Sequence, residues 1–359
     1  MIIREYRVNQ GEICFLGSMS DILNYYRFNI SEFFILGMGP GLQFRIKNCH
    51  TDEICSLEYR IETVDLNKDF KEFEELFSNL GFSINKNTFD KFEDIENNLV
   101  LNLIDKRPVM VDVDVFNLKY HVDYEKTHHA HIVVIYGIDK ENGKFFIADS
   151  YITTLKKSNY MGALELVELP QILDLTQVKS TKRYICWNML RSSANHPFMS
   201  TDVAKKIRNS GKKIKNSSNR NGWISGLDAI RQFNTKINEL SRLELTSEIK
   251  SFLELIYKML TGFGGPTATR KLFGQFLYWG ITNAGIKIPE TIADRYIELA
   301  KKWGKFSRLL MKTVILEDIQ YLHKADKEMQ EIVIEEEQLA EIISHIQTST
   351  ECKIGDNVF

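Results

Sequence analysis

The chain has 359 residues and a formal net charge of −2, from 46 Lys and Arg against 48 Asp and Glu. Hydrophobic residues make up 43% and charged residues 26%, a balance that supports packed cores and argues against disorder. The length favours two domains, because domains hold about 100–200 residues. A near-neutral charge argues against nucleic-acid binding as the primary role, since such domains carry a basic excess.

The amino terminus does not have the pattern of a secretory signal. Charged residues interrupt residues 1–8, and no later apolar run reaches the roughly 18 residues of a membrane span. We expect a soluble cytoplasmic protein. The five cysteines are odd in number, lack CxxC spacing and fit free thiols in a reducing compartment; they are Cys14, Cys49, Cys55, Cys186 and Cys352.

The first predicted element is a helix with a cysteine at its amino end. Apolar residues from Cys14 to Tyr26 recur at helical spacing. A second short helix is predicted through Phe34 and Leu36, with Asn29 or Ser31 as its cap and a glycine-rich loop after it. Cys14 is therefore expected next to the free N–H groups of a helix start.

The next predicted elements are strands. Residues 109–115 alternate valine with other residues, which predicts a strand with one buried face and places Asp112 and Asp114 on a solvated face. The runs 131–138 and 144–149 flank a turn-rich loop and predict a hairpin, and residues 183–189 predict a further strand.

The hairpin allows a geometric test of a possible site. If residues 139–143 form the loop, Ile138 lies opposite Lys144 and Val134 lies opposite Ala148. His131 and Asp149 are then diagonal neighbours on one face, about 7–8 Å apart at the backbone. A loop longer or shorter by one residue would place the two side chains on opposite faces.

The second half of the sequence is almost wholly helical, so we place a domain boundary near residue 190 and expect domains at 1–190 and 191–359. The basic, Ser- and Asn-rich residues 205–220 are typical of a solvated linker, or of a segment that attracts an acidic partner. The loop 262–266 lacks a Walker lysine and a preceding strand, which argues against nucleotide binding. Helices are predicted at 223–243, 246–261, 267–284, 289–313 and 317–346.

Cys14, His131 and Asp149 have the residue types of a thiol nucleophile, its base and an orienting carboxylate. The dipole and N–H groups of a helix start favour a thiolate. The alternative for Cys14 is an inert buried thiol, because cysteine is among the most buried residue types. The alternative for Asp149 is a turn-forming aspartate at a strand end.

The histidines around His131 leave a second interpretation open. His129 and His131 share a face of a strand, as in an HxH zinc site. No third ligand stands at a standard spacing, although Asp112, Asp114 or His121 could serve. A metal site therefore competes with the triad.

Several motifs in chain order resemble a known family. The first half carries Cys14, Ser31-Glu32, Asp112-Val-Asp114, His131-Ile-Val-Val and Ala148-Asp149, and the second half carries Gly222, Ala229-Ile, Gly264-Gly265, Arg270, Phe276-Leu277 and Trp303. This order resembles the amino-terminal domain of butirosin-biosynthesis protein H and the helical domain that accompanies it. The resemblance spans most of the chain.

The resemblance implies an α+β class with a papain-like fold, in which an antiparallel sheet and a nucleophile helix precede an all-α domain. It relates the chain to bacteriocin-processing cysteine peptidases and to amide formers of closthioamide-type assembly. It implies acyl transfer from the phosphopantetheine thioester of an acyl or peptidyl carrier protein to a small amine, in antibiotic biosynthesis, without a bound cofactor or metal. The helical domain would be a lid and a carrier-docking surface, and homodimers are left open.

By position, the resemblance makes Cys14 the nucleophile, His131 the general base and later acid, and Asp149 the orienting group. Papain-like peptidases have an oxyanion-hole glutamine six residues before the cysteine, where this chain has Val8. Asn9 or Gln10, together with the Cys14 N–H, would replace it.

Two further acidic residues are candidates for supporting roles. Glu32 matches the Ser-Glu pair of the family and would support the structure or contact substrate, and Asp114 is a second candidate.

Two other functions remain open. A peptidase or thioesterase would use the same triad with water as the acceptor, and a binding or immunity protein could keep the scaffold without catalysis. The complete Cys14, His131 and Asp149 set argues against the last of these.

Overall fold

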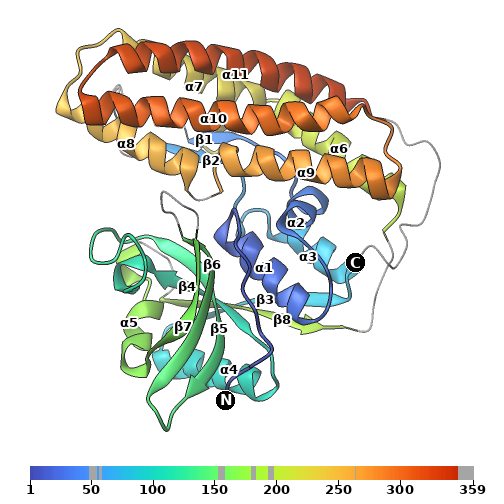
Figure 1. Ribbon diagram of the computed structural model, residues 1–359, viewed down its shortest axis with the longest axis vertical. Coiled ribbons are helices and arrows are strands. Elements are labelled where there is room, and N and C mark those ends of the chain that lie inside the picture. The colour runs from blue at the N-terminus through green and yellow to red at the C-terminus, as the bar shows by residue number, and fades with distance from the viewer. Residues whose placement is uncertain are drawn as a thin grey trace. The chain divides into compact units, whose positions relative to one another are not determined.

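A computed structural model describes residues 1–47, 55, 59–152, 158–178, 183–192, 198–262 and 264–346. The predicted α+β class and helical carboxyl-terminal region are confirmed, with two antiparallel sheets and helices (Figure 1). The chain divides into two compact units. The sheet unit comprises Met1–Ile35 with Phe73–His196, and the helical unit comprises Leu36–Glu72 with Pro197–Val358.

The sheet unit is built on six antiparallel strands in the order β3-β8-β4-β5-β6-β7. The predicted strands β4, β5, β6 and β8 are present, and β3 and β7 add strands that the sequence did not predict. The bounds are β3 Phe82–Phe89, β4 Val109–Asp114, β5 Ala130–Asp139, β6 Lys144–Ile152, β7 Ser158–Glu165 and β8 Tyr184–Arg191.

Helices cover this sheet, and α1 positions the cysteine. It begins at Cys14 as predicted, ends at Tyr25, and packs against β5 and β6, the strands that carry His131 and Asp149. Its apolar residues are buried, which holds the helix on the sheet. The other helices that include residues of this unit are α2 Glu32–Met38, α3 Phe70–Asn79, α4 Phe92–Ile104 and α5 Leu169–Leu173.

The prediction of a solvated face on β4 is wrong. Every residue of this strand is buried, and Asp112 and Asp114 are only 8% and 1% exposed. The strand lies between β8 and β5, with α4 and α5 packed on it. The two carboxylates are tolerated inside because each accepts hydrogen bonds, Asp112 from the Trp187 indole at 3.0 Å.

The predicted register of the hairpin is right near the site and wrong near the turn. Val134 pairs with Ala148 as expected, but Lys144 pairs with Asp139 and not with Ile138. A β-bulge between Ile135 and Gly137 absorbs the difference of one residue. The bulge therefore keeps His131 and Asp149 on one face.

The helical unit consists of long helices and a small four-stranded sheet in the order β2-β1-β10-β9. The segment 205–220, expected as a linker, instead forms most of α6 and strand β9, because Val203, Ile207 and Ile214 give α6 a buried apolar face. The bounds are β1 Arg45–Lys47, β2 Arg60–Glu62, α6 Ser200–Lys215, β9 Ser218–Arg220, β10 Trp223–Ser225, α7 Gly226–Ser241, α8 Ser247–Thr261, α9 Pro266–Ala284, α10 Glu290–Leu316 and α11 Gln320–Ser344.

Strands β9 and β10 form a tight hairpin that the sequence did not predict. Its turn residues Asn221 and Gly222 have φ angles of 53° and 76°, the left-handed conformation that two-residue hairpin turns require. Strand β1 pairs with β10, so that Arg45 lies opposite Ser225. Residues 36–72 thus contribute strands to the sheet of the helical unit.

A buried ion pair lies in the core of the helical unit. Arg270 donates from Nε to Glu336 Oε1 at 2.8 Å, and their side chains are 0% and 1% exposed. The Trp303 indole donates to the same oxygen at 2.9 Å, and Arg270 also donates to the Gln43 carbonyl. This pair joins α9, α10, α11 and the segment before β1.

Within the described parts of the chain, no helix has the length and apolar character needed to cross a membrane. Cys14, Cys55 and Cys186 are free thiols, as predicted. Cys49 and Cys352 lie outside the described residues.

Candidate active site

The loop before α1 is fixed so that Cys14 is the first helical residue. Glu32 accepts hydrogen bonds from the backbone N–H groups of Glu12 at 2.8 Å and Ile13 at 3.3 Å. Ser150 adds two contacts, because its carbonyl accepts from the Gly11 N–H at 2.7 Å and its hydroxyl donates to the Cys14 carbonyl at 3.2 Å. Glu32 therefore supports the nucleophile loop, which is one of the two roles expected for it.

Two glycines make room for these supports. A Cβ atom on Gly11 would lie 2.7 Å from Glu32 Oε1, and one on Gly17 would lie 2.3 Å from Ser150 Oγ. Either substitution would push a supporting side chain away from the loop. The close fit explains glycine at both positions without any need for unusual backbone angles.

His131 joins Cys14 to Asp149. Its Nε2 lies 2.9 Å from Asp149 Oδ2, and the two side chains are 7% and 0% exposed. Cys14 also acts on the imidazole, because its charge and hydrogen bonding contribute to the raised pKa of His131, and since Nε2 contacts Asp149, Nδ1 is the nitrogen available to the sulfur. Cys14 itself is half-buried. The three residues thus form one connected chain from strand to helix start.

The charges around His131 favour the protonated form of its imidazole. Burial alone would lower the pKa of His131, but the negative charges of Asp149 and Cys14 and the hydrogen bonds to both outweigh it, and the pKa is raised well above the usual value. A histidine that keeps its proton beside a thiol favours the thiolate, which is the nucleophilic form of cysteine.

Other groups fix the Asp149 carboxylate. The Tyr120 hydroxyl donates to Oδ2 at 3.2 Å, and the Tyr151 N–H donates to Oδ1 at 3.0 Å. The Tyr120 ring stacks on Tyr160, with centroids 3.9 Å apart. Sequence reasoning missed Tyr120, because nothing in the motif around it differs from an ordinary loop tyrosine.

The neighbouring histidines pair with separate carboxylates. His128 Nδ1 lies 2.6 Å from Asp114 Oδ2, which gives Asp114 a structural partner, and His129 Nε2 lies 3.9 Å from Asp123. In the described part of the chain, no group of three or more His, Cys, Asp or Glu side chains is arranged to hold a metal ion.

His121 is a second buried histidine beside the triad. Its ring centroid lies 5.4 Å from that of His131. Burial and the neighbouring charge of His131 lower its pKa to about 4, so it is neutral near pH 7. Its Nδ1 accepts the Asp123 N–H at 3.2 Å. A neutral His121 leaves the positive charge on His131.

The two residues expected as oxyanion donors, Asn9 and Gln10, have other surroundings in the structure. The Asn9 backbone N–H and side-chain amide both donate to Asp21, at 3.0 and 2.8 Å. Gln10 lines a cavity of about 590 Å³ whose lining includes none of the triad residues. Asp21 itself is buried, which raises its pKa to about 7 despite the hydrogen bonds from Asn9.

Two family models match this chain. Residues 13–150 match the family described as "Butirosin biosynthesis protein H, N-terminal", and residues 175–343 match "Domain of unknown function (DUF4872)". The chain is thus similar to the butirosin biosynthesis protein H family over its first part, and to a domain without an assigned function over its second part. The first match begins one residue before Cys14 and ends one residue after Asp149. No curated protein matches this chain.

The second match contains the buried pair of the helical unit. Arg270 and Trp303, both part of the sequence resemblance to the butirosin biosynthesis protein H family, donate to one oxygen of Glu336. Both residues therefore have a structural role in the core of the helical unit.

Proposed function

We propose that this chain is a papain-like, cysteine-dependent acyltransferase that forms amide bonds in antibiotic-type biosynthesis. It would take an acyl group from the phosphopantetheine thioester of a carrier protein and deliver it to a small amine. The observation that carries the proposal is His131, which bonds to both Cys14 and Asp149. The family match, named for butirosin biosynthesis, supports this chemistry over proteolysis.

The first half-reaction is an acyl exchange between sulfurs. The Cys14 thiolate attacks the thioester carbonyl, and the tetrahedral intermediate expels the phosphopantetheine thiolate, which takes a proton from the His131 imidazolium. The products are an acyl-Cys14 thioester, a free carrier thiol and a neutral His131. Asp149 holds the imidazole in position during this transfer.

The second half-reaction forms the amide. The amine attacks the acyl-Cys14 carbonyl, neutral His131 accepts the proton that the amine loses, and the C–S bond breaks to release Cys14 as a thiolate. The amide leaves, and the thiolate–imidazolium pair is restored. The conversion of a thioester to an amide is favourable, so no nucleotide is needed to drive it.

The developing oxyanion needs donors that are already in place. The Cys14 backbone N–H is our first candidate, because the first N–H groups of a helix have no partner within the helix. Asn9 already binds Asp21, so a second donor from the substrate or from another backbone N–H fits better. The helical residues 198–346 are our candidate for carrier docking.

The direct test is acyl transfer to Cys14. We expect intact-protein mass spectrometry to show one acyl adduct after incubation with an acyl carrier protein, and amide product after addition of an amine. Cys14→Ala should abolish both, whereas Cys55→Ala, which removes another half-buried free thiol, should leave both intact. An adduct of undiminished yield on Cys14→Ala would contradict the proposal.

Hydrolysis is the second candidate function. Cys14 is partly open to solvent, which favours access of water to an acyl-enzyme. The ratio of amide to free acid, measured over a range of amine concentrations, separates the two. Free acid as the sole product at every amine concentration would make the chain a thioesterase or peptidase.

A further inference from the structure

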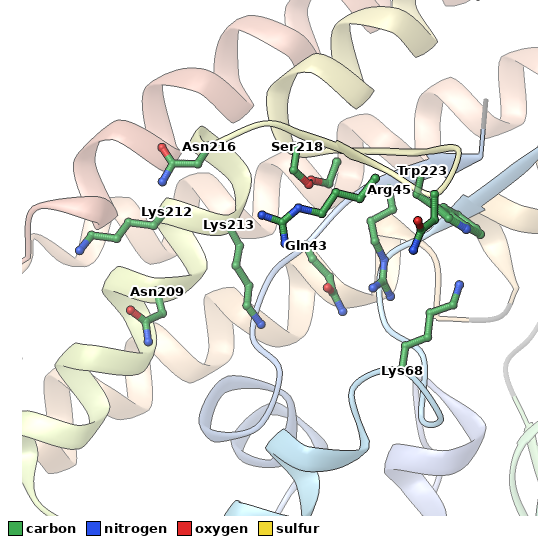
Figure 2. A pocket seen from close by; sticks show the side chains of 12 residues that line it. Gln43, Arg45, Lys68, Asn209, Lys212, Lys213, Asn216, Ser218 and Trp223 are labelled. Atoms are coloured by element: carbon green, nitrogen blue, oxygen red, sulfur yellow. The ribbon is translucent and has the colours of Figure 1, made fainter.

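The helical unit contains a cavity of about 600 Å³ that the catalytic proposal does not use (Figure 2). Segments far apart in the sequence line it, from the residues around β1, from Lys68, from α6 and from the β9–β10 hairpin. Five cationic residues contribute to the lining, together with amide and hydroxyl side chains and one tryptophan. The cations are Arg45, Lys68, Lys212, Lys213 and Arg220.

Arg45 has unused hydrogen-bond donors in this cavity. Its Nε and Nη2 atoms are buried and have no hydrogen-bond partner. The nearest carboxylates, Glu62 and Asp69, lie 3.7 and 3.8 Å from Nη2, which is beyond hydrogen-bond distance. Both carboxylates have closer partners, Lys68 at 2.5 Å and Gln43 at 2.6 Å. The Arg45 side chain as a whole is 18% exposed, and buried donor atoms without a partner are costly unless a ligand or water satisfies them.

Lys68 is paired with Glu62, but three of the other cations have weaker partners or none among the described residues. Lys213 lies 3.5 Å from Glu72 and donates to a backbone carbonyl. Lys212 and Arg220 form no ion pair with any residue in the described ranges. The five cations exceed the three carboxylates beside them, Glu62, Asp69 and Glu72, by two charges. None of the described lining residues is acidic.

The shape and composition of the cavity favour a ligand over a solvated surface. Figure 2 shows Arg45, Gln43 and Lys213 around a common space, with Lys68 on the side of Trp223. The Lys68 ammonium lies 3.9 Å from the centre of the Trp223 ring, a cation–π contact that orders this wall. Guanidinium and ammonium groups bind phosphate oxygens well, and amides and hydroxyls add further donors.

The size of the cavity points to more than an inorganic ion. Pockets for organic ligands measure about 300–1,000 Å³. We propose that this cavity binds an organic phosphate ester, with the phosphate held by Arg45 and neighbouring cations. The ester is either a free small molecule of the coenzyme A type or the phosphopantetheine arm of a carrier protein. Both present the same phosphate chemistry.

The test is calorimetry on the full chain at low salt. We expect 4′-phosphopantetheine to bind and pantetheine, which lacks the phosphate, to bind at least tenfold more weakly. Arg45→Gln should weaken phosphopantetheine binding at least tenfold. Lys205→Gln is the matched control, because it removes a charge from α6 outside the cavity lining and should leave binding unchanged.

Further binding measurements distinguish the two possible sources of the phosphate. A second variant and a check of folding guard against misfolding. Tighter binding of coenzyme A than of a phosphopantetheinylated carrier indicates a free ligand, and the reverse order indicates the carrier; either order supports a phosphate-ester site. Arg220→Gln on the exposed hairpin provides a second variant if Arg45→Gln does not fold. Circular dichroism checks the fold of each variant.

Three results would overturn the proposal: equal binding of pantetheine and phosphopantetheine, no loss of affinity in either folded arginine variant, or an equal loss in Lys205→Gln. The site is independent of the proposed catalysis, so binding should persist in Cys14→Ala. Failure of acyl transfer with intact phosphate binding, or the opposite, would therefore distinguish the two proposals.

Discussion

The two units each contain a buried carboxylate that binds a cation and an aromatic side chain through one oxygen. In the sheet unit Asp149 Oδ2 contacts His131 and Tyr120, and in the helical unit Glu336 Oε1 contacts Arg270 and Trp303. The difference lies in the cation. Arginine stays protonated under all ordinary conditions, whereas histidine can release its proton.

The two cations also differ in how accessible their surroundings are to solvent. Arg270 and Glu336 are enclosed, with exposed fractions of 0% and 1%. His131 bonds onward to Cys14, which is partly accessible. Similar local bonding therefore encloses a permanent charge in the helical unit, whereas in the sheet unit it holds a charge that can move to an accessible atom, as the proposed function requires.

The largest expected effect is a loss of acyl-transfer activity when Asp149 is substituted. We expect Asp149→Asn to lower kcat/KM for acyl transfer by about 10²–10⁴, the range seen when the orienting carboxylate of a triad is lost. The negative charge of Asp149 raises the pKa of His131, so its removal should lower that pKa and move the alkaline limb of the pH profile toward lower pH.

Rates measured from pH 5 to 10 check this, with Asp123→Asn as a control that alters a carboxylate beside another histidine. An alkaline limb that stays in place in Asp149→Asn would contradict the role given to Asp149.

The next effect concerns stability in the helical unit. Glu336→Gln leaves the Arg270 charge buried without a counter-ion and should lower the free energy of unfolding by about 3–5 kcal/mol. Glu337→Gln breaks an exposed pair with Arg231 at 2.9 Å and should cost about 0–1 kcal/mol. Urea unfolding followed by tryptophan fluorescence compares them. Equal losses would mean that the buried pair is not structural.

The third prediction concerns Asp21, a buried carboxyl group in the sheet unit, and the pH dependence of stability. Burial raises the pKa of Asp21 to about 7, so the folded chain keeps a proton that the unfolded chain releases near pH 4. Stability therefore falls as the pH rises from about 4 to 7. Asp21→Asn removes this dependence, and its stability relative to the parent should increase by about 2–3 kcal/mol from pH 5 to pH 8.

Thermal and urea unfolding at the two pH values measure this change. Asp228→Asn on the surface should show no such dependence on pH. A constant difference between Asp21→Asn and the parent would show that Asp21 is ionised throughout.

The smallest effect concerns the aromatic partner of Asp149. Tyr120→Phe removes one hydrogen bond at 3.2 Å and should cost about 0.5–1.5 kcal/mol of transition-state stabilisation, or roughly 2- to 10-fold in kcat/KM. Tyr160→Phe keeps the stacked ring and changes no bond to Asp149, so it should have little effect. An equal or larger loss in Tyr160→Phe would mean that the effect does not come from the hydrogen bond between Tyr120 and Asp149.

The sequence predicted those parts of the molecule that depend on local pattern. The start of α1 at Cys14 and the long helices after residue 226 follow from apolar spacing. The meeting of His131 and Asp149 was predicted from the register, but the bulge that preserves it is a tertiary feature without a clear local signal.

Features set by long-range packing were missed. The burial of Asp112 and Asp114 depends on neighbouring strands and on Trp187, which are distant in sequence. Helix α6 was not predicted because its composition is basic and only its buried face shows the apolar pattern. Tyr120 gains its role solely through the fold, as does the pairing of Asn9 with Asp21.

The path of the chain limits how the protein can be divided. It passes from the sheet unit to the helical unit after residue 35, returns after residue 72 and leaves again after residue 196. A fragment truncated near residue 190 would keep β1 and β2 but lose β10, the strand that pairs with β1. Expression of the first half alone would therefore expose an unpaired strand edge, so this protein is better made as one chain that contains both units.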